Sequence, residues 1–155
     1  MRPSKAKLAG CLLVWSALAC SAEPIQPIDP VGDWTLDLTM TAGSGTCTVT
    51  GALLRIEAAG PPVTGEVTGG SLACTDDGAW PGRQVVRGTL DGESIALGLG
   101  LPGAGYYPFV LEGKAQEDAM SGTIRVEPGS QVAVSGHWSA ARSSGGAADR
   151  SAALP

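Results

Sequence analysis

The chain has 155 residues, with 23 glycines, 11 prolines and only 16% charged residues. This length suits one ordinary domain, and the composition favours many short strands and turns. The formal net charge is −5, and because an acidic chain without a basic cluster repels phosphates, nucleic acid is excluded as a partner.

The chain begins with a segment typical of an export signal. Residues 1–7, MRPSKAK, hold three basic side chains and no acidic one, and residues 8–19, LAGCLLVWSALA, are apolar apart from Ser16. A basic start, an apolar run of about a dozen residues and a small-residue exit define such signals. The run is too short to cross a membrane, which takes roughly 20 residues. We expect residues 1–19 to be a signal peptide, and without them 7 basic residues face 15 acidic ones, a net charge of −8.

The cysteines leave two processing routes open. Leu8-Ala9-Gly10-Cys11 matches a lipobox, but almost no apolar region precedes it. Ala17-Leu18-Ala19-Cys20 lies at the right place with leucine one position late, and it resembles a bacterial lipoprotein signal in which Cys20 becomes the acylated first residue. We therefore expect an envelope lipoprotein of the outer membrane that touches the membrane only through its anchor. The alternative is cleavage after Ala22, which would give a soluble periplasmic or secreted protein.

The composition also divides the mature chain. Residues 20–30 hold three prolines in their last ten positions and predict a stiff tether. Residues 143–155, SSGGAADRSAALP, are small and polar, which predicts a disordered tail. The folded domain is expected over residues 31–142.

Within this domain apolar residues recur at every second position, which indicates strands and no helix. The expected strands are 31–40, 46–58, 63–75, 83–90, 93–101, 106–116, 119–127 and 131–142. Short turn-rich connections predict an antiparallel meander. Because the number of strands is even, the last strand can pair with the first and remove both edges. We expect an all-β, eight-stranded, up-and-down barrel, with a β-sandwich as the alternative.

Two hairpins carry local signals. A turn at Gly60-Pro61 pairs residues whose numbers sum to 121, which places Cys47 opposite Cys74 and Arg55 opposite Glu66. After acylation of Cys20 or cleavage after Ala22, only Cys47 and Cys74 remain free to pair, so we expect a structural disulfide between them. The same register predicts a salt bridge between Arg55 and Glu66. Asp91-Gly92 predicts a type I′ turn.

The strand that follows this turn has an unusual outward face. Ala96, Gly98 and Gly100 alternate with leucines. Glycines there would allow sharp coiling of the barrel, the interpretation we favour, or another surface could approach them.

Gly32-Asp33-Trp34 resembles the Gly-x-Trp of the first strand in lipocalin-like, or calycin, barrels. The resemblance covers residues 31–142 in overall plan, and its specific motif is these residues plus one late arginine. It implies that Arg142 packs over Trp34 and closes one end. Trp138 would also lie near Trp34 across the seam. Avidin-type members carry asparagine two positions after the tryptophan, where this chain has Leu36, so biotin binding is not implied.

A barrel of this size either fills its interior with side chains or holds one small ligand. The candidate lining of a ligand site is apolar and consists of Trp34, Leu36, Leu97, Leu99, Tyr107, Phe109 and Trp138. Without a charged anchor, a guest would be apolar or amphiphilic, such as an envelope lipid fragment. The alternative is that these side chains only pack against one another.

Trp80 and Tyr106 are candidates for an entrance or recognition surface, because Trp80 lies in an expected loop and Tyr106 lies at the turn where the strand 106–116 begins. Asp76-Asp77 lacks the further oxygen ligands that calcium needs. His137 is the only histidine, and no catalytic, cofactor or metal motif appears. We expect a binding module for a hydrophobic small molecule or lipid rather than an enzyme. A protein-interaction or inhibitor module is the first alternative, and a cyclase- or isomerase-type barrel, which would need a polar group inside, is a distant one.

Overall fold

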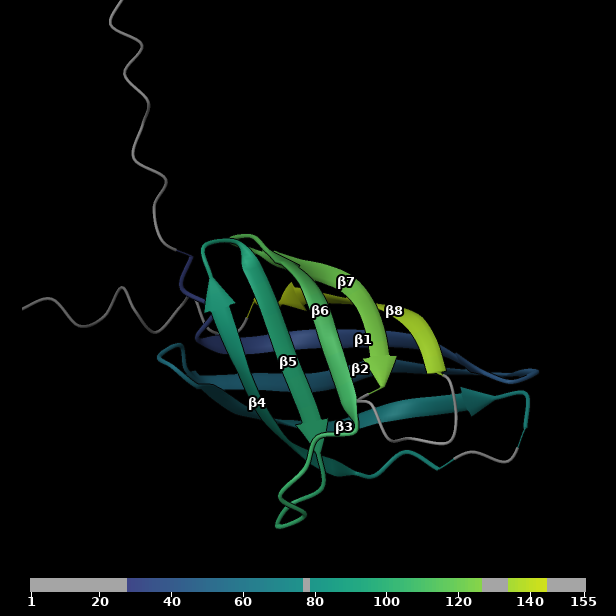
Figure 1. Cartoon of the computed structure of the whole chain (residues 1–155). Coiled ribbons are helices and arrows are strands. Elements are labelled where there is room, and N and C mark those ends of the chain that lie inside the picture. Colours follow the sequence, from purple (N-terminus) through teal and green to yellow (C-terminus); the bar gives the residue numbers. More distant parts are fainter. Residues whose placement is uncertain (1–27, 77–78, 127–133, 145–155) are drawn as a thin grey trace, which may run out of the picture.

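A computed structural model describes residues 28–76, 79–126 and 134–144. The described chain has no helix and forms a closed antiparallel barrel in which each strand pairs with the next (Figure 1). The strands are β1 (Gly32–Ala42), β2 (Gly45–Ala58), β3 (Val63–Cys74), β4 (Arg83–Asp91), β5 (Ser94–Gly100), β6 (Phe109–Ala115), β7 (Ala119–Val126) and β8 (Val134–Arg142). The predicted eight-stranded barrel is confirmed. The signal peptide and nearly all of the tail and tether predicted from the sequence lie outside the described residues.

The barrel closes through pairing of β1 with β8. Trp34 stands opposite Arg142, and Leu38 stands opposite Trp138. This ladder removes the two free edges that an open meander would leave, and it excludes the β-sandwich. The two tryptophans lie on neighbouring strands of the seam, each opposite a different residue.

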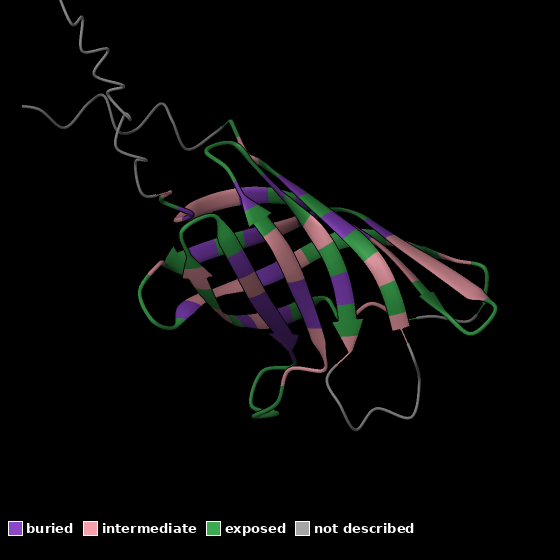
Figure 2. Ribbon diagram, turned by 45° about the horizontal axis from the view of Figure 1, so that its top comes forward, coloured by how far each residue is buried: buried purple, intermediate pink, exposed green. Residues whose placement is uncertain are grey.

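Alternation separates the two faces of the wall. In β1, Trp34, Leu36 and Leu38 are buried and the residues between them are exposed, and similar bands run along the other strands (Figure 2). Side chains at every second position of a strand point to the same face, so the apolar set gathers inside. The buried core includes Trp34, Leu36, Leu38, Val49, Leu54, Ile56, Val63, Val67, Val86, Ile95, Leu97, Leu99, Leu111, Met120, Ile124 and Trp138.

The register of the β2–β3 hairpin agrees with the sequence. Cys47 pairs with Cys74 and Arg55 with Glu66, and the two cysteines form a disulfide with their Cα atoms 4.1 Å apart. The predicted salt bridge is wrong. Arg55 binds Asp33 of β1 at 2.8 Å instead, because β2 has a second neighbour whose register places Asp33 opposite Arg55.

The turn between β4 and β5 differs from the predicted type I′. Asp91 pairs with Ser94, so the two central residues are Gly92 and Glu93. Gly92 has a φ of 57°, and no described non-glycine residue has a positive φ. A type I′ turn needs positive φ at both central positions, whereas a type II′ turn needs it only at the first. The turn therefore follows the type II′ pattern.

Several glycines allow neighbouring strands to approach closely. A Cβ atom on Gly113 would collide with the backbone oxygen of Ser121, and one on Gly136 would collide with that of Thr39. These glycines belong to β6 and β8, and the missing side chain permits the close approach that a coiled barrel wall needs. The coiling role that the sequence suggested for glycine therefore applies at these positions.

The two ends of the barrel differ. The described chain enters and leaves at the end that carries Arg142, which we call the Arg142 end (Figure 1). The opposite end carries the β3–β4 and β5–β6 connections, and we call it the loop end. There β1, β2 and β3 extend past the shorter strands. β3 runs to Cys74, but it pairs with β4 only from Val63 to Thr68.

Candidate ligand-binding regions

The Arg142 end is closed by a packed cation and aromatic ring. The guanidinium carbon of Arg142 lies 4.2 Å from the ring centroid of Trp34, as the resemblance to calycins implied. The indole Nε1 of Trp34 donates a hydrogen bond to the backbone oxygen of Pro30 at 2.8 Å. Pro30 is buried, so the last residues of the predicted tether belong to the folded domain.

Arg142 also joins two backbone segments through three hydrogen bonds. Its Nη2 donates to the oxygen of Asp29 at 2.8 Å and its Nη1 to that of Val31 at 3.1 Å. Its Nε donates to the oxygen of Glu117 at 2.9 Å. The planar guanidinium suits this role, because its donors point in fixed, divergent directions. Trp34 beneath the guanidinium has no exposed surface, so this part of the end is covered.

The predicted interior residues form a packed core. Trp34, Leu36 and Leu97 have no exposed surface, Leu99 is 1% exposed and Trp138 is 2% exposed. An internal cavity that admitted a water-sized sphere would give its lining residues exposed surface, so at these positions the side chains pack against one another. This part of the interior is therefore filled by side chains, which is the alternative to a ligand cavity that the sequence left open.

The loop end is less tightly covered. Met40, Leu72, Trp80 and Phe109 are partly buried there and pack against the core. The Trp80 indole Nε1 donates to the backbone oxygen of Gly69 at 2.9 Å. Trp80 thus folds back onto the barrel, and its ring and its N–H group are both engaged.

Tyr107 does not take its predicted position inside the barrel, whereas Tyr106 is exposed in the β5–β6 connection. A Cβ atom on Gly98 would lie 2.8 Å from Cβ of Tyr107, and one on Gly100 would lie 3.0 Å from Cδ1 of the same ring. Since both glycines face outward, Tyr107 packs on the outside of β5 and does not line the interior. Tyr106 is 63% exposed beside it. The sequence missed this because Tyr107 precedes β6, where strand alternation no longer applies.

Gln84 is the one buried polar residue in the described part of the chain, and it was not among the interior candidates from the sequence. It is 3% exposed, it lies opposite Val67 near the loop end, and its amide Nε2 has no hydrogen-bond partner among the described residues. The signal was present, because Arg83 and Arg87 flank it on the outward face and alternation then turns Gln84 inward. The list of interior candidates contained only apolar residues.

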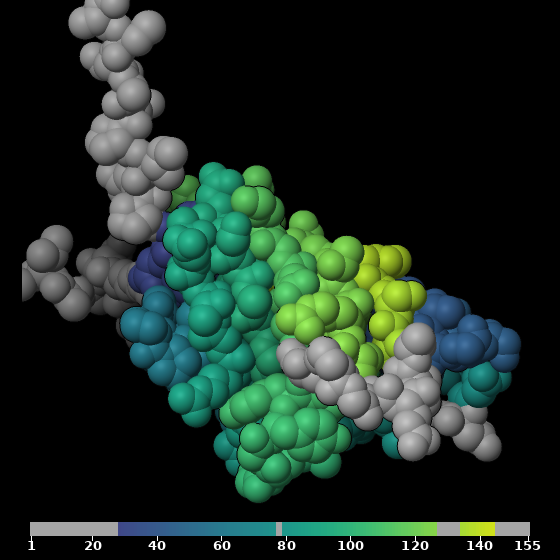
Figure 3. Space-filling model, viewed as in Figure 1, coloured from purple at the N-terminus to yellow at the C-terminus, as the bar shows by residue number. Residues whose placement is uncertain are grey.

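A groove with a volume of about 410 Å³ lies on the outer face of β4, β5 and β6. Figure 3 looks onto this face, and the connection between β5 and β6 stands out below it. Pro62 borders the groove. Its main lining residues are Arg87, Thr89, Ala96, Gly98, Tyr107 and Val110. The small outward residues of β5 are thus approached by a loop of the same chain, which the sequence analysis had ranked second.

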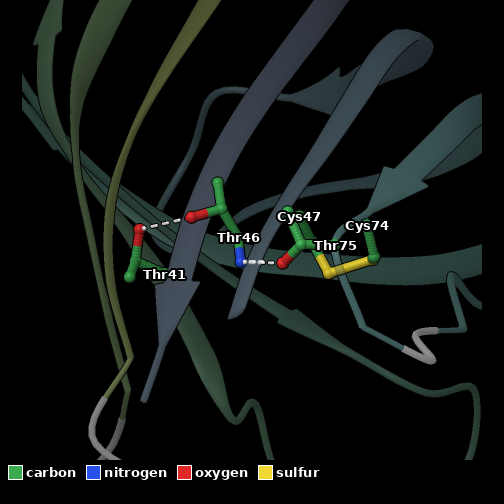
Figure 4. The surroundings of a disulfide bond; sticks show 5 residues. All are labelled: Thr41, Thr46, Cys47, Cys74 and Thr75. Carbon is green, nitrogen blue, oxygen red and sulfur yellow. Dashed lines mark hydrogen bonds between the residues drawn. A yellow bond between two sulfur atoms is a disulfide. The ribbon is translucent and has the colours of Figure 1, made fainter. Parts of the chain in front are cut away.

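The disulfide lies at the extended tip of β1–β2–β3, where Cys47 stands opposite Met40 (Figure 4). Thr46 donates its backbone N–H to the hydroxyl of Thr75 at 3.0 Å, and Thr75 donates its N–H to the oxygen of Thr46 at 3.0 Å. These contacts fasten the end of β3, which has no β4 partner at this level. The disulfide and the two threonine hydrogen bonds therefore have a structural role.

Charged groups of the described residues offer no catalytic arrangement. The hydrogen bond from Arg55 holds the pKa of Asp33 below its usual value of 3.8, but the pair is at the surface. His137 is exposed, and no cluster of three metal-binding side chains occurs in the described ranges. The same ranges contain no helix long and apolar enough to cross a membrane.

Comparison with known proteins adds no relative. No protein-family model, no curated protein and no solved structure matches this chain.

Proposed function

We infer that this protein is an exported, lipid-anchored barrel that binds a small, uncharged amphiphilic molecule, such as an acyl ester or lipid fragment, at its loop end. The observation that carries this proposal is the unpartnered amide of Gln84. A buried donor without an acceptor costs about 1–3 kcal/mol, and such a group in a well-packed barrel calls for a partner. A ligand carbonyl or hydroxyl oxygen would supply the acceptor.

The surroundings of Gln84 favour an apolar ligand body. The partly buried Met40, Leu72, Trp80 and Phe109 cover the core at this end, and the interior beyond them is filled. A ligand would therefore lie across the loop end, with its polar atom toward Gln84. Within the described ranges no charged side chain is buried beside Gln84, which argues for an uncharged ligand group.

The alternatives receive less support. A protein-interaction module was motivated by Trp80, whose indole N–H and ring are occupied by contacts within the chain. A barrel enzyme requires a polar interior group, and Gln84 is one, but a carboxamide does not exchange protons near neutral pH and cannot act as a general acid or base.

The test is titration with a fluorescent fatty-acid methyl ester, using the exported chain with Cys20→Ala so that no acyl anchor competes. We expect saturable binding that Gln84→Leu weakens at least tenfold. The same substitution removes an unsatisfied amide, so the protein should unfold at a higher urea concentration. Gln116→Leu, at an exposed glutamine of the opposite end, serves as the matched control and should change neither property.

A trapped water would also satisfy Gln84. In that case the affinity for the ester would be the same in the wild type and in Gln84→Leu, and the proposal would be wrong. Absence of saturable binding to the unsubstituted chain would overturn it as well.

A further inference from the structure

We propose that the groove on the outer face of β4–β6 is a second, separate site that binds a small apolar monocarboxylate. The groove lies outside the wall, whereas Gln84 lies inside it, so this proposal does not depend on the ligand at the loop end. Its volume of about 410 Å³ falls in the range of roughly 300–1,000 Å³ that small-ligand sites occupy.

The register explains why the face is hollow. Arg87 stands opposite Gly98, and Gly98 stands opposite Val110. Thr89 and Ala96 form the adjacent pair. Because side chains on one face of paired strands normally touch, a glycine and an alanine in the middle strand leave a trough between the larger side chains on either side.

The chemistry of the trough is amphiphilic. Val110 faces outward in β6 but is only 7% exposed, and the Tyr107 side chain packs on Gly98 beside it. These residues provide an apolar wall and floor. The hydroxyl of Thr89 and the guanidinium of Arg87 border the other side, so a bound molecule would meet its polar contacts along one edge only.

Arg87 supplies the anion specificity. Four other arginines form ion pairs with carboxylates: Arg55 with Asp33, Arg83 with Glu66, Arg125 with Glu112 and Arg142 with Asp118. Arg142 is also held by backbone oxygens. In the described part of the chain Arg87 is the only arginine without an ion pair or hydrogen bond. An unpaired guanidinium beside an apolar trough is complementary to a carboxylate with an apolar body.

Binding of decanoate, a simple apolar monocarboxylate, tests the proposal. Decanol and decyltrimethylammonium have similar chains with a neutral and a cationic head, and calorimetric titration below micelle-forming concentrations compares all three. We expect decanoate to bind at least tenfold more tightly than decanol, and the cation not to bind. In nuclear magnetic resonance spectra decanoate should shift the backbone amide signals of Ala96, Gly98 and Val110.

Four variants assign the effect to the groove. Arg87→Gln should weaken decanoate binding at least tenfold and leave decanol unaffected, while Arg87→Lys should retain most of the affinity because it keeps the charge. Arg83→Gln, which removes a cation from the same face of the same strand outside the groove, should have no effect. Ala96→Leu should fill the floor and abolish binding, with the thermal midpoint used to confirm that the variant is folded.

Equal loss of affinity in Arg83→Gln and Arg87→Gln would show general charge attraction and overturn the proposal. So would equal affinity for decanoate and decanol, or amide shifts confined to the loop end. The two proposals fail separately, because Gln84→Leu should leave decanoate binding intact and Arg87→Gln should leave binding of the methyl ester intact.

Discussion

Arg142 shows how one side chain can close a barrel end. It stacks on Trp34 and donates three hydrogen bonds to the backbone of the N-terminal segment and of the β6–β7 turn. A cation over an indole contributes about 0.5–2 kcal/mol, and hydrogen bonds from a charged donor add to this. The role depends on the shape of the guanidinium as much as on its charge.

We therefore predict that Arg142→Lys lowers the free energy of unfolding by about 1–2 kcal/mol although the charge is kept, because one ammonium cannot serve three divergent acceptors. Urea unfolding measures the loss. Arg83→Lys is the control, since the ion pair of Arg83 with Glu66 is at the surface and such pairs contribute little. Equal losses in the two variants would show that the geometry of Arg142 is unimportant.

Asp33 gives a prediction about pH. Its pKa is lowered from 3.8, mainly by the hydrogen bond from Arg55, so the ion pair stabilises the fold above the unfolded pKa and this contribution is lost as the pH falls through the folded pKa. The contribution is small, because the Arg55 and Asp33 side chains are 48% and 38% exposed. Asp33→Asn should be slightly less stable than the wild type near neutral pH and equal to it in acid.

Unfolding curves measured between about pH 7 and about pH 2 test this linkage. High salt should shrink the difference near neutral pH, because exposed charges are screened. A difference of the same size at both ends of the pH range would mean that the side chain matters through packing and not through its charge.

At the scale of single residues, the sequence predicted a side-chain contact correctly where a single neighbouring strand determines it. Gly32-Asp33-Trp34 predicted the partner of Arg142 correctly. The predicted partner of Arg55 was wrong, because the β2–β3 hairpin supplies only one of the two strands that flank β2 in the barrel. Gln84 was not predicted to lie inside the barrel, because only apolar residues were chosen as interior candidates, although its position in the strand turns its side chain inward.

At the scale of the elements, the β2–β3 hairpin is the best-determined part of the fold. Its register satisfies the disulfide and the apolar alternation together, and a slip of one residue would turn every core side chain outward. The distal part of β3 depends more on the disulfide than the rest, because beyond Thr68 it pairs with β2 alone.

We predict that replacing both cysteines, Cys47→Ala with Cys74→Ala, lowers the free energy of unfolding by about 3–4 kcal/mol, the loop-closure value for a sequence separation of 27. The wild type after reduction should unfold like the double variant. Hydrogen exchange should speed up first at residues 70–74. A double variant as stable as the oxidised protein would show that the extended tip is held by the ladder and the threonine contacts alone.

The element boundaries that the sequence missed share one cause. The β4–β5 turn and the β5–β6 connection both depend on backbone dihedrals and on packing outside the wall, which alternation does not report. Tyr107 illustrates the second case, because its position follows from the absence of side chains on Gly98 and Gly100 of the preceding strand. The Ala/Gly pattern indicated that something approaches there, but not which segment does so.

At the scale of the whole molecule, even strand number and a consistent alternation were sufficient to predict closure. They could not predict the unequal strand lengths, which let β1–β3 project beyond the barrel, or the location of the hollow on the outer wall. The two ends of the barrel also differ in their distance along the chain from the proposed lipid anchor. Ile28, the first described residue, lies at the Arg142 end and packs against the core.

The proposed anchor at Cys20 therefore fixes an orientation. The eight residue steps from Cys20 to Ile28 span at most about 28 Å, so an acylated protein would hold its Arg142 end near the membrane and direct the loop end away from it. We predict that a palmitate analogue labels the protein and that Cys20→Ala abolishes labelling and releases the protein from membranes. Fluorophores attached through Glu117→Cys and Ala104→Cys then report the two ends, and quencher lipids should quench the first much more strongly. Persistent labelling of Cys20→Ala would refute the anchor. Equal quenching at both ends would refute only the orientation, because the labelling result does not depend on which end of the barrel faces the membrane.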